Sequence, residues 1–257
     1  MRDSEGRRIA IVIHGAFQSH GNIAGAALVL KDSGVKEVHM PDLAGHGAEK
    51  DIERSEQNLT ERLAEELLSR REINQSLKEG IADSVTVIGH SLGASVALTV
   101  ATQAMVHSKS LNLILVEPIF WLGSECEGQD HLSQNLDIHT PHNKTHIEIT
   151  EYLRALLKGD KQQSSDFSLL TNLANLDKAT ITLIRGGVRT IQSKEEFKIE
   201  TSEKVITYSV SGQEIGSLVP DNYCNRELFD NQLTIRDAGH NPFASSSFYR
   251  WLRLLIS

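Results

Sequence analysis

A serine between two glycines is the strongest chemical signal in this sequence. Gly89-His-Ser-Leu-Gly93 fits the pattern G-x-S-x-G, after a short apolar run and before an Ala-rich segment of helical character. In a strand–turn–helix unit of this kind, the sharp turn exposes the serine hydroxyl, and side chains at the glycine positions would collide with neighbouring elements. The pentapeptide arises by chance in roughly one chain in ten of this length. Its context therefore favours Ser91 as a nucleophile.

Two further motifs supply the remaining parts of an acyl-transfer site. The segment H-G-A-F ends the first apolar run, where an N–H of Ala16 or Phe17 together with that of Leu92 would form an oxyanion hole. The segment A-G-H-N-P-F follows the last predicted strand and contains His240. A histidine on a loop at that edge of a sheet can serve as base and then as acid.

These residues need a sheet that brings the ends of distant segments together. Short apolar segments alternate with helical ones, which predicts βαβ units and a parallel, doubly wound sheet of the α/β class. We expect strands at 9–13, 35–40, 85–88, 111–116, 179–184 and 233–236, and helices at 23–33, 59–68, 92–107 and from 243 to the end, with helical patches near 147–158 and 166–177.

The alternation stops between residues 119 and 178, a polar and histidine-rich stretch without a buried-strand signal. Sixty such residues are too many for an ordinary loop, so we predict an inserted helical lid on a core of residues 1–118 and 179–257. Phe120 and Trp121 begin this lid and either line a substrate pocket or pack the lid. A second long connection, 190–232, contains apolar runs at 205–210 and 215–219 that suggest an extra hairpin, to which the sequence assigns no role.

Taken together, the chain resembles the α/β-hydrolase family over nearly its whole length. The segments H-G-A-F, P-D-L-A-G-H-G, G-H-S-L-G and A-G-H-N-P-F occur in family order and spacing. The resemblance implies that Ser91 is the nucleophile and His240 the base. It also implies that His46 belongs to a structural turn and that His90 is a supporting contact. We expect the family's N-terminal hairpin to be missing, because eight residues precede the first predicted strand in this sequence.

The third member of the triad departs from the family pattern. After the strand at 179–184 the sequence reads R-G-G-V-R-T, which places Arg189 where the family usually has an aspartate. Some α/β-hydrolases take the acid from the end of the preceding strand, which here is Glu117. A carboxylate there could orient the imidazole and keep the chain order Ser…Glu…His. Asp221, Asp230 and a site without an acid remain alternatives.

Histidines of the predicted lid, His139, His142 and His146 with His131 nearby, have a spacing that could bind zinc. No cysteine or carboxylate completes a tight motif, and Pro141 interrupts a helical face. We therefore predict a polar lid segment, no metal and no organic cofactor. The cysteines at 126 and 224 are expected to be plain thiols, too few for a disulfide framework.

Composition limits the classes of partner. Lys and Arg number 26 and Asp and Glu 34, a net charge of −8, which argues against a nucleic-acid or anionic membrane surface. No apolar run approaches the ~20 residues of a membrane span, and the N-terminus does not read as a secretory signal. We expect a soluble, cytoplasmic protein with a small-molecule acyl substrate, and the oligomeric state is left open.

The function predicted is that of a serine hydrolase acting on a small carboxylic ester, thioester or lactone through an acyl-enzyme on Ser91. Serine at position 91, in the sharp turn between strand and helix, argues against haloalkane dehalogenases and epoxide hydrolases, which use aspartate there. A cofactor-free lyase or carbon–carbon bond hydrolase of the same fold is one alternative. A catalytically impaired binding protein is the other.

Overall fold

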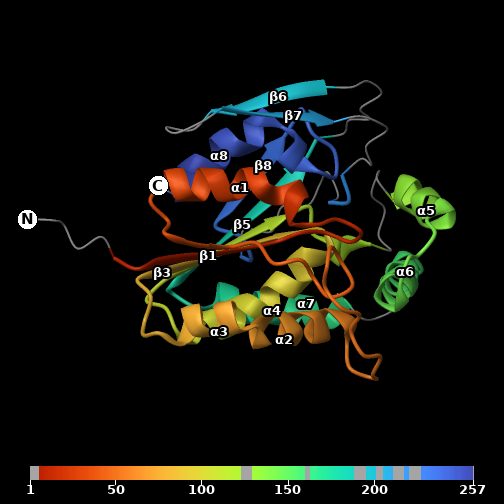
Figure 1. The fold of residues 1–257 in the computed structure, drawn as a ribbon, viewed down its shortest axis with the longest axis horizontal. Helices are drawn as coiled ribbons and strands as arrows, with labels where there is room; N and C mark the ends of the chain where they lie inside the picture. Colours follow the sequence, from red (N-terminus) through yellow and green to blue (C-terminus); the bar gives the residue numbers. More distant parts are fainter. Residues whose placement is uncertain are drawn as a thin grey trace, which may run out of the picture.

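The computed structural model describes residues 6–122, 129–159, 163–187, 195–200, 205–210, 217–219 and 227–256. Within them, six strands form one parallel sheet (Figure 1): β1 (Arg8–Ile13), β2 (Glu37–His39), β3 (Ser84–His90), β4 (Leu111–Val116), β5 (Ala179–Gly186) and β8 (Asn231–Ile235). Their order across the sheet is β2-β1-β3-β4-β5-β8, and every neighbouring pair is parallel. This confirms the predicted doubly wound α/β sheet.

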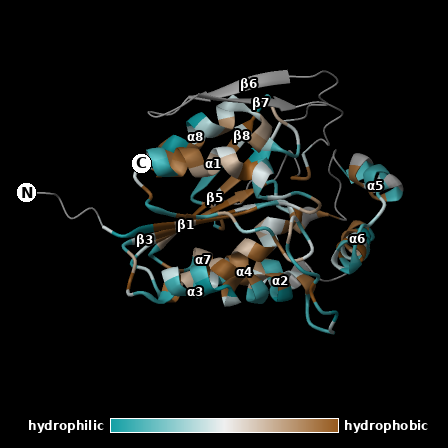
Figure 2. Cartoon of the chain, in the orientation of Figure 1, coloured by the Kyte–Doolittle hydropathy of each residue, from teal (hydrophilic) through white to brown (hydrophobic). Residues whose placement is uncertain are grey.

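The central strands are continuous apolar runs because helices cover both faces of the sheet. Almost every residue of β1, β3 and β4 is buried. One face carries α1 (His20–Asp32) and α8 (Ser246–Ile256), and the other carries α2 (Leu59–Ser69), α3 (Arg71–Lys78), α4 (Leu92–Val106) and α7 (Gln163–Ala174) (Figure 1). Figure 2 shows hydrophobic residues along the strands and on the inner sides of these helices, while the outer sides of α2 and α3 are hydrophilic. Two apolar cores result, one on each face.

The segment 119–178 divides into parts with different positions. The short 3₁₀ helix η1 (Ile119–Trp121) follows β4, and α7 packs against α4 on the face of the sheet. Of the described helices in this segment, α5 (Gln129–Ile138) and α6 (Lys144–Leu157) lie beyond the carboxyl ends of the strands (Figure 1). The helices α3 and α5 were not predicted, since neither contains a long apolar repeat.

Helix α6 is tied to the loop between β2 and α2 at its first turn. The Asp51 carboxylate accepts hydrogen bonds from the backbone N–H and the hydroxyl of Thr145, and the Thr145 hydroxyl accepts one from the Ile52 N–H. The side chain of Asn143 caps the helix and also donates to the Gly45 carbonyl. A buried ion pair joins Arg62 of α2 to Glu148. These contacts hold α6 in place against α2 and the loop between β2 and α2.

The predicted hairpin at 205–219 is wrong in one of its strands. Residues Val205–Val210 do form a strand, β7, but its antiparallel partner is β6 (Glu195–Glu200), which precedes it. Residues 217–219 pack at the carboxyl edge of the main sheet instead, where Leu218 and Val219 belong to its core. The chain closes with the 3₁₀ helix η2 (Pro242–Ala244) before α8. None of the described helices combines the length and the apolar character that crossing a bilayer requires.

The carboxyl group of Asp166, on α7, is buried in the helical layer and is 5% exposed. Burial, with a smaller contribution from the negative charge of Glu61, raises the pKa of this group to about 6. Its pKa in the unfolded chain is about 3.9. The folded protein therefore binds this proton more tightly, so the contribution of Asp166 to stability is fully present below pH 4 and is lost as the pH rises through 6.

Replacing Asp166 by asparagine should remove this pH dependence. At pH 8 we expect Asp166→Asn to be more stable than the parent by about 1–3 kcal/mol, because the variant has no buried charge to desolvate. At pH 4 the two proteins should unfold within about 0.5 kcal/mol of each other. Urea unfolding at both pH values measures the two differences. An equal difference at pH 4 and pH 8 would contradict the assignment.

Candidate active site

Ser91 occupies a strained turn between β3 and α4. Its backbone has φ 53° and ψ −120°, a conformation that residues other than glycine rarely adopt. A Cβ atom on Gly89 would lie 2.6 Å from the Cβ of Ala97, and one on Gly93 would lie 2.7 Å from the carbonyl oxygen of Ile13. Both flanking positions therefore require glycine, as the G-x-S-x-G pattern predicts, and the turn directs the hydroxyl away from the sheet.

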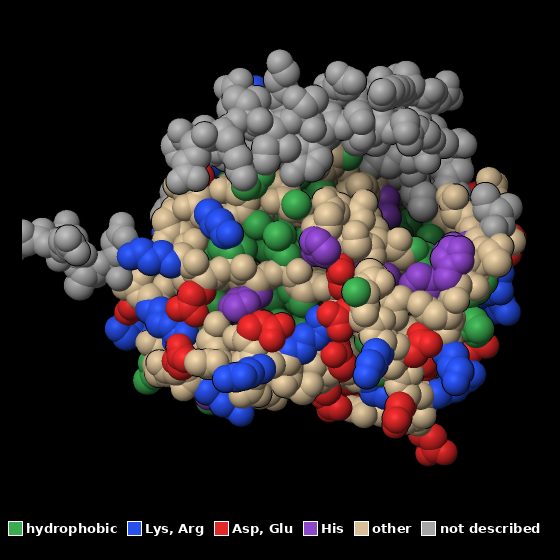
Figure 3. All heavy atoms as spheres, in the orientation of Figure 1, with side chains coloured by type: hydrophobic (Ala, Val, Ile, Leu, Met, Phe, Trp, Pro, Cys, Tyr) green, Lys and Arg blue, Asp and Glu red, His purple; other side chains and the backbone are tan. Residues whose placement is uncertain are grey.

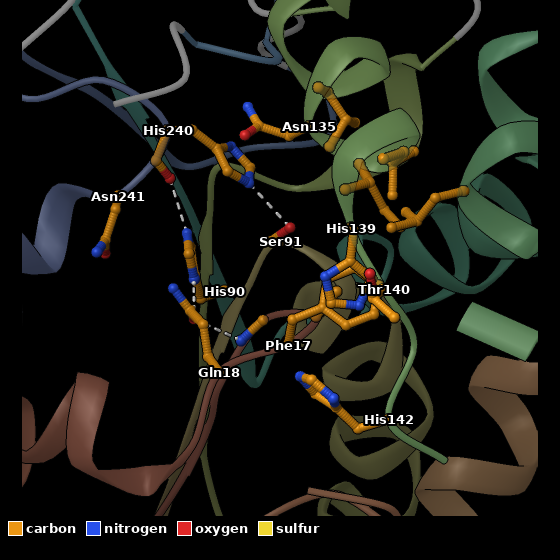
Figure 4. A pocket seen from close by; sticks show the side chains of 16 residues that line it. Phe17, Gln18, His90, Ser91, Asn135, His139, Thr140, His142, His240 and Asn241 are labelled. Carbon is orange, nitrogen blue, oxygen red and sulfur yellow. Dashed lines mark hydrogen bonds between the residues drawn. The ribbon is translucent and has the colours of Figure 1, made fainter. Parts of the chain in front are cut away.

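His240, on the loop after β8, points at this serine (Figure 4). Its Nε2 lies 2.9 Å from the Ser91 hydroxyl oxygen, and its Nδ1 lies 3.2 Å from Oε2 of Glu117. A neutral imidazole in this position can accept the serine proton at Nε2 while its Nδ1–H donates to the carboxylate. The predicted nucleophile, base and acid thus lie in one hydrogen-bonded chain.

The Glu117 carboxylate is completely buried and accepts four hydrogen bonds. Besides His240, the backbone N–H of Gly186 donates at 2.5 Å, the hydroxyl of Ser217 at 2.6 Å and the backbone N–H of Leu218 at 2.7 Å. Two donors serve each oxygen, which fills most of the capacity of a carboxylate and fixes its plane. Sequence reasoning missed Ser217 and Leu218, because they are about one hundred residues from Glu117 and no motif marks them.

The other carboxylates considered for this role do not reach His240 in the described residues. Asp230 accepts a hydrogen bond from the Ile181 N–H at 2.7 Å and joins the start of β8 to β5. Asp221 and Arg189 lie outside the described part of the chain. The described carboxylate that faces the imidazole is Glu117.

The turn after β1 packs against the serine elbow. A Cβ on Gly15 would lie 3.0 Å from the Cβ of Ser91, a tight contact that would require the turn or the elbow to shift slightly. The N–H of Phe17 donates to Nε2 of His46 at 3.1 Å. That N–H is therefore engaged, and Ala16 remains of the two candidates for the oxyanion hole. No hydrogen bond among the described residues uses the N–H of Ala16 or of Leu92.

His90 joins the two loops that carry the site. Its ring is buried, its Nε2–H donates to the carbonyl oxygen of His240 at 2.7 Å, and its Nδ1 lies 2.9 Å from Oε1 of Gln18 (Figure 4). The same Gln18 oxygen accepts the Gly15 N–H. Burial, and secondarily the nearby His240, lowers the pKa of His90 to about 3. His90 is therefore a neutral structural contact, as the family resemblance implies.

A cavity of about 580 Å³ opens onto Ser91 and His240 between the sheet edge and helices α5 and α6. Apolar side chains form one part of its wall, and polar ones, mostly nearer solvent, form the other. The apolar group is Phe17, Ile119, Leu132, Leu136 and Leu153, and the polar group is Gln18, Asn135, His139, Thr140, His142 and Asn241. The size and mixed lining suit a small organic molecule.

Phe120 and Trp121 were predicted either to line a substrate pocket or to pack the lid, and the structure describes the side chain of Phe120. Phe120 is 1% exposed, packs edge to face on Phe167 of α7 and belongs to the core, and the residue of η1 that lines the cavity is Ile119. Phe120 is therefore a packing residue. The side chain of Trp121 lies outside the described part of the structure.

Histidine side chains gather where α5 and α6 meet the core (Figure 3). The rings of His139, His142 and His146 have centroids 6.1–6.2 Å apart, and His139 stacks on Phe17 at 4.0 Å. Within the described residues, no group of three potential ligands has a metal-binding arrangement. The side chain of His131 and both cysteines, Cys126 and Cys224, lie outside the described part.

Comparison with known proteins places this geometry in context. Residues 10–177 match the sequence profile of the alpha/beta hydrolase family. A thermophilic esterase from Thermogutta terrifontis superposes with a TM-score of 0.56 at 17% identity, covering 98% of this chain and 91% of that one. The thioesterase domain from the curacin biosynthetic pathway gives 0.54 at 16% identity (98% and 92%), and a mutant of the meta-cleavage product hydrolase CumD gives 0.52 at 15% (98% and 90%). A search of curated proteins finds no significant match. At these identities the solved structures show a shared fold.

The close packing around Gly89, beside Ser91, leads to a prediction about the stability of the fold. Gly89→Ala should destabilise the fold by about 1–3 kcal/mol, because the added methyl group is forced against Ala97 and the backbone of α4. Gly21→Ala is the matched control, since its nearest neighbour would be the Ser19 hydroxyl at 3.5 Å and alanine favours the helix by up to about 1 kcal/mol. Urea unfolding measures both. Equal stability of the two variants would show that the elbow is not tightly packed.

Proposed function

Because the chain belongs to the alpha/beta hydrolase family, we propose that it is a serine hydrolase that cleaves a small carboxylic ester, thioester or lactone. The observation that carries the proposal is the unbroken hydrogen-bonded chain from Ser91 through His240 to Glu117 at the floor of a cavity. A serine held against a base, with the base oriented by a third group, is the arrangement that activates a hydroxyl nucleophile.

In the first step the Ser91 oxygen attacks the substrate carbonyl carbon as its proton passes to Nε2 of His240. The carboxylate of Glu117 holds the imidazole through Nδ1–H and stabilises the imidazolium that forms. His240 then gives the proton to the departing alcohol, thiol or ring oxygen as the carbon–heteroatom bond breaks. A water, deprotonated by the same histidine, then attacks the acyl carbon. The bond from that carbon to the Ser91 oxygen breaks, His240 returns the proton to the serine oxygen, and the acid is released. These steps need no metal or organic cofactor.

The negative charge on the substrate oxygen must be matched by donors that are already in place. The backbone N–H groups of Ala16 and Leu92 are suited to this task, because they flank the elbow and are used by no described hydrogen bond. Removing one such donor typically costs ~3 to 4 kcal/mol of transition-state stabilisation. Leu132 and Leu136 of α5 and Leu153 of α6 offer the acyl part an apolar wall.

Covalent labelling tests the nucleophile directly. A fluorophosphonate probe should label the wild-type protein, and Ser91→Ala should abolish labelling and turnover, because the activated hydroxyl is gone. Steady release of p-nitrophenol from p-nitrophenyl acetate or butyrate, measured by absorbance, separates an ester hydrolase from a lyase or carbon–carbon bond hydrolase of the same fold. Absence of wild-type labelling would favour a binding protein and overturn the proposal.

The acid has its own test. Glu117→Gln should lower kcat for p-nitrophenyl butyrate by a factor of up to about 10⁴, because the amide favours the wrong imidazole tautomer. Asp230→Asn is the matched control, since Asp230 also accepts a strand N–H but lies away from His240, and it should keep kcat within about threefold. Circular dichroism checks that both variants fold. Turnover of a folded Glu117→Gln variant within threefold of the wild type would rule out the acid assignment.

A further inference from the structure

We infer that His46 is a positioning residue for the oxyanion hole, a role that rests on the proposed acyl transfer. The family resemblance implies only a structural turn at this position. In the structure His46 comes from the loop after β2 and its Nε2 accepts the Phe17 N–H at 3.1 Å, one residue beyond the proposed oxyanion donor Ala16. It does not line the substrate cavity.

The turn that His46 holds is strained. Phe17 has φ 58°, a conformation that costs a non-glycine residue energy and persists only where the surroundings impose it. The phenyl ring is held by His139, 4.0 Å away between centroids, and by the edge of His146 at 5.3 Å. The backbone is held by His46. Without that hydrogen bond, the N–H of the peptide between Ala16 and Phe17 is unpaired, and the peptide is free to rotate out of its strained conformation.

His14 fixes the peptide on the other side of Ala16. Its Nδ1–H donates to the carbonyl oxygen of Gly15 at 2.8 Å. In a trans peptide the N–H points opposite to the C=O, so this bond aims the Ala16 N–H away from His14. The two histidines thus orient the two peptide units that flank Ala16, and with them the proposed oxyanion donor.

The two rings form a reciprocal pair between the turn and the loop at 42–47. His14, from the turn, accepts the Leu43 N–H on Nε2 at 3.0 Å, while His46, from the loop, accepts the Phe17 N–H. The Nδ1–H of His46 donates to the Ala44 carbonyl at 3.0 Å, which fixes its tautomer. The rings lie 5.0 Å apart and both are buried.

This arrangement works only with neutral rings. A proton on Nε2 of His46 would face the Phe17 N–H and break the bond. The titratable groups around His46 are His14, His146 on α6 and Asp42, and Asp42 is the only acid among them. Burial, the dominant effect, lowers the pKa of both His14 and His46 and keeps them uncharged near neutral pH.

The test compares His46→Gln with His46→Asn, two variants whose side-chain amides lie at different distances from the backbone. In His46→Gln the terminal amide can occupy the place of Nε2, whereas in His46→Asn it reaches only the place of Nδ1, so that it keeps the Ala44 contact and loses Phe17. We expect His46→Asn to lower kcat about 10- to 100-fold with KM within threefold, because a misplaced donor weakens the transition state and not substrate binding. His46→Gln should recover kcat to within about fivefold of the wild type.

The affinity for a trifluoromethyl ketone that carries the same alkyl chain as the butyrate substrate is a second measurement. The ketone adds to Ser91 as a hemiketal whose oxyanion needs the same donors, so its affinity should fall in His46→Asn by the same factor as kcat. His39→Asn is the control, because the ring of His39, on β2, hydrogen-bonds the Ser76 hydroxyl at 2.9 Å and does not line the cavity. It should keep kcat within about threefold.

The inference is overturned if His46→Asn keeps kcat within threefold, if His46→Gln is impaired as much as His46→Asn, or if KM rises while kcat and ketone affinity are kept. Each of these results requires an active wild type. A wild-type protein without Ser91-dependent turnover would instead overturn the proposed function, so the two failures are distinguishable.

Discussion

The burial of the Glu117 carboxylate is the constraint on which the site depends. A charge removed from water is tolerated only where hydrogen-bond donors replace the lost hydration. Here the donors come from the end of β5, from residues 217–218 and from the loop after β8. Segments that are far apart in sequence are therefore held at one point by a single side chain, and the orientation of His240 follows from their meeting.

Strain is concentrated at the same edge of the sheet. Among the described residues, the non-glycine residues with positive φ are Phe17, Ser91 and Glu117. They follow β1, β3 and β4, three adjacent strands. Conformations of this kind cost of order 1–3 kcal/mol each and survive where the surrounding structure determines them. The buried parallel strands and the glycine contacts at the elbow supply that determination, so the apolar core of the sheet is what keeps the reactive groups in place.

The sequence predicted the sheet, because continuous apolar strands alternating with helices leave few other arrangements. Its motifs also indicated Ser91 and His240 as partners, since each follows a recognisable strand and the carboxyl ends of parallel strands lie at one edge. The family resemblance added Glu117, with Asp221, Asp230 and a site without an acid left open. The hydrogen bonds that orient these residues were beyond it. Ser217 carries no local motif, and the N–H of Phe17 meets His46 only through the packing of two loops. The sequence left open whether Phe120 lines a pocket or packs, because its contact with Phe167 joins η1 to the distant helix α7.

The position of the proposed acid follows from the geometry of neighbouring strands. β4 and β5 are adjacent and in register, with Val116 opposite Ile184, and the Glu117 N–H donates to the Ile184 carbonyl at 2.8 Å. A carboxylate at the end of β4 therefore starts beside the loop after β5 that usually supplies an aspartate in the family. Glutamate is one methylene longer than aspartate, and that extra reach helps it meet a histidine delivered by β8 from two strands away. With the proposed acid on β4, an arginine at 189 is compatible with the proposed triad, because the chain beyond Gly187 no longer has to provide a carboxylate.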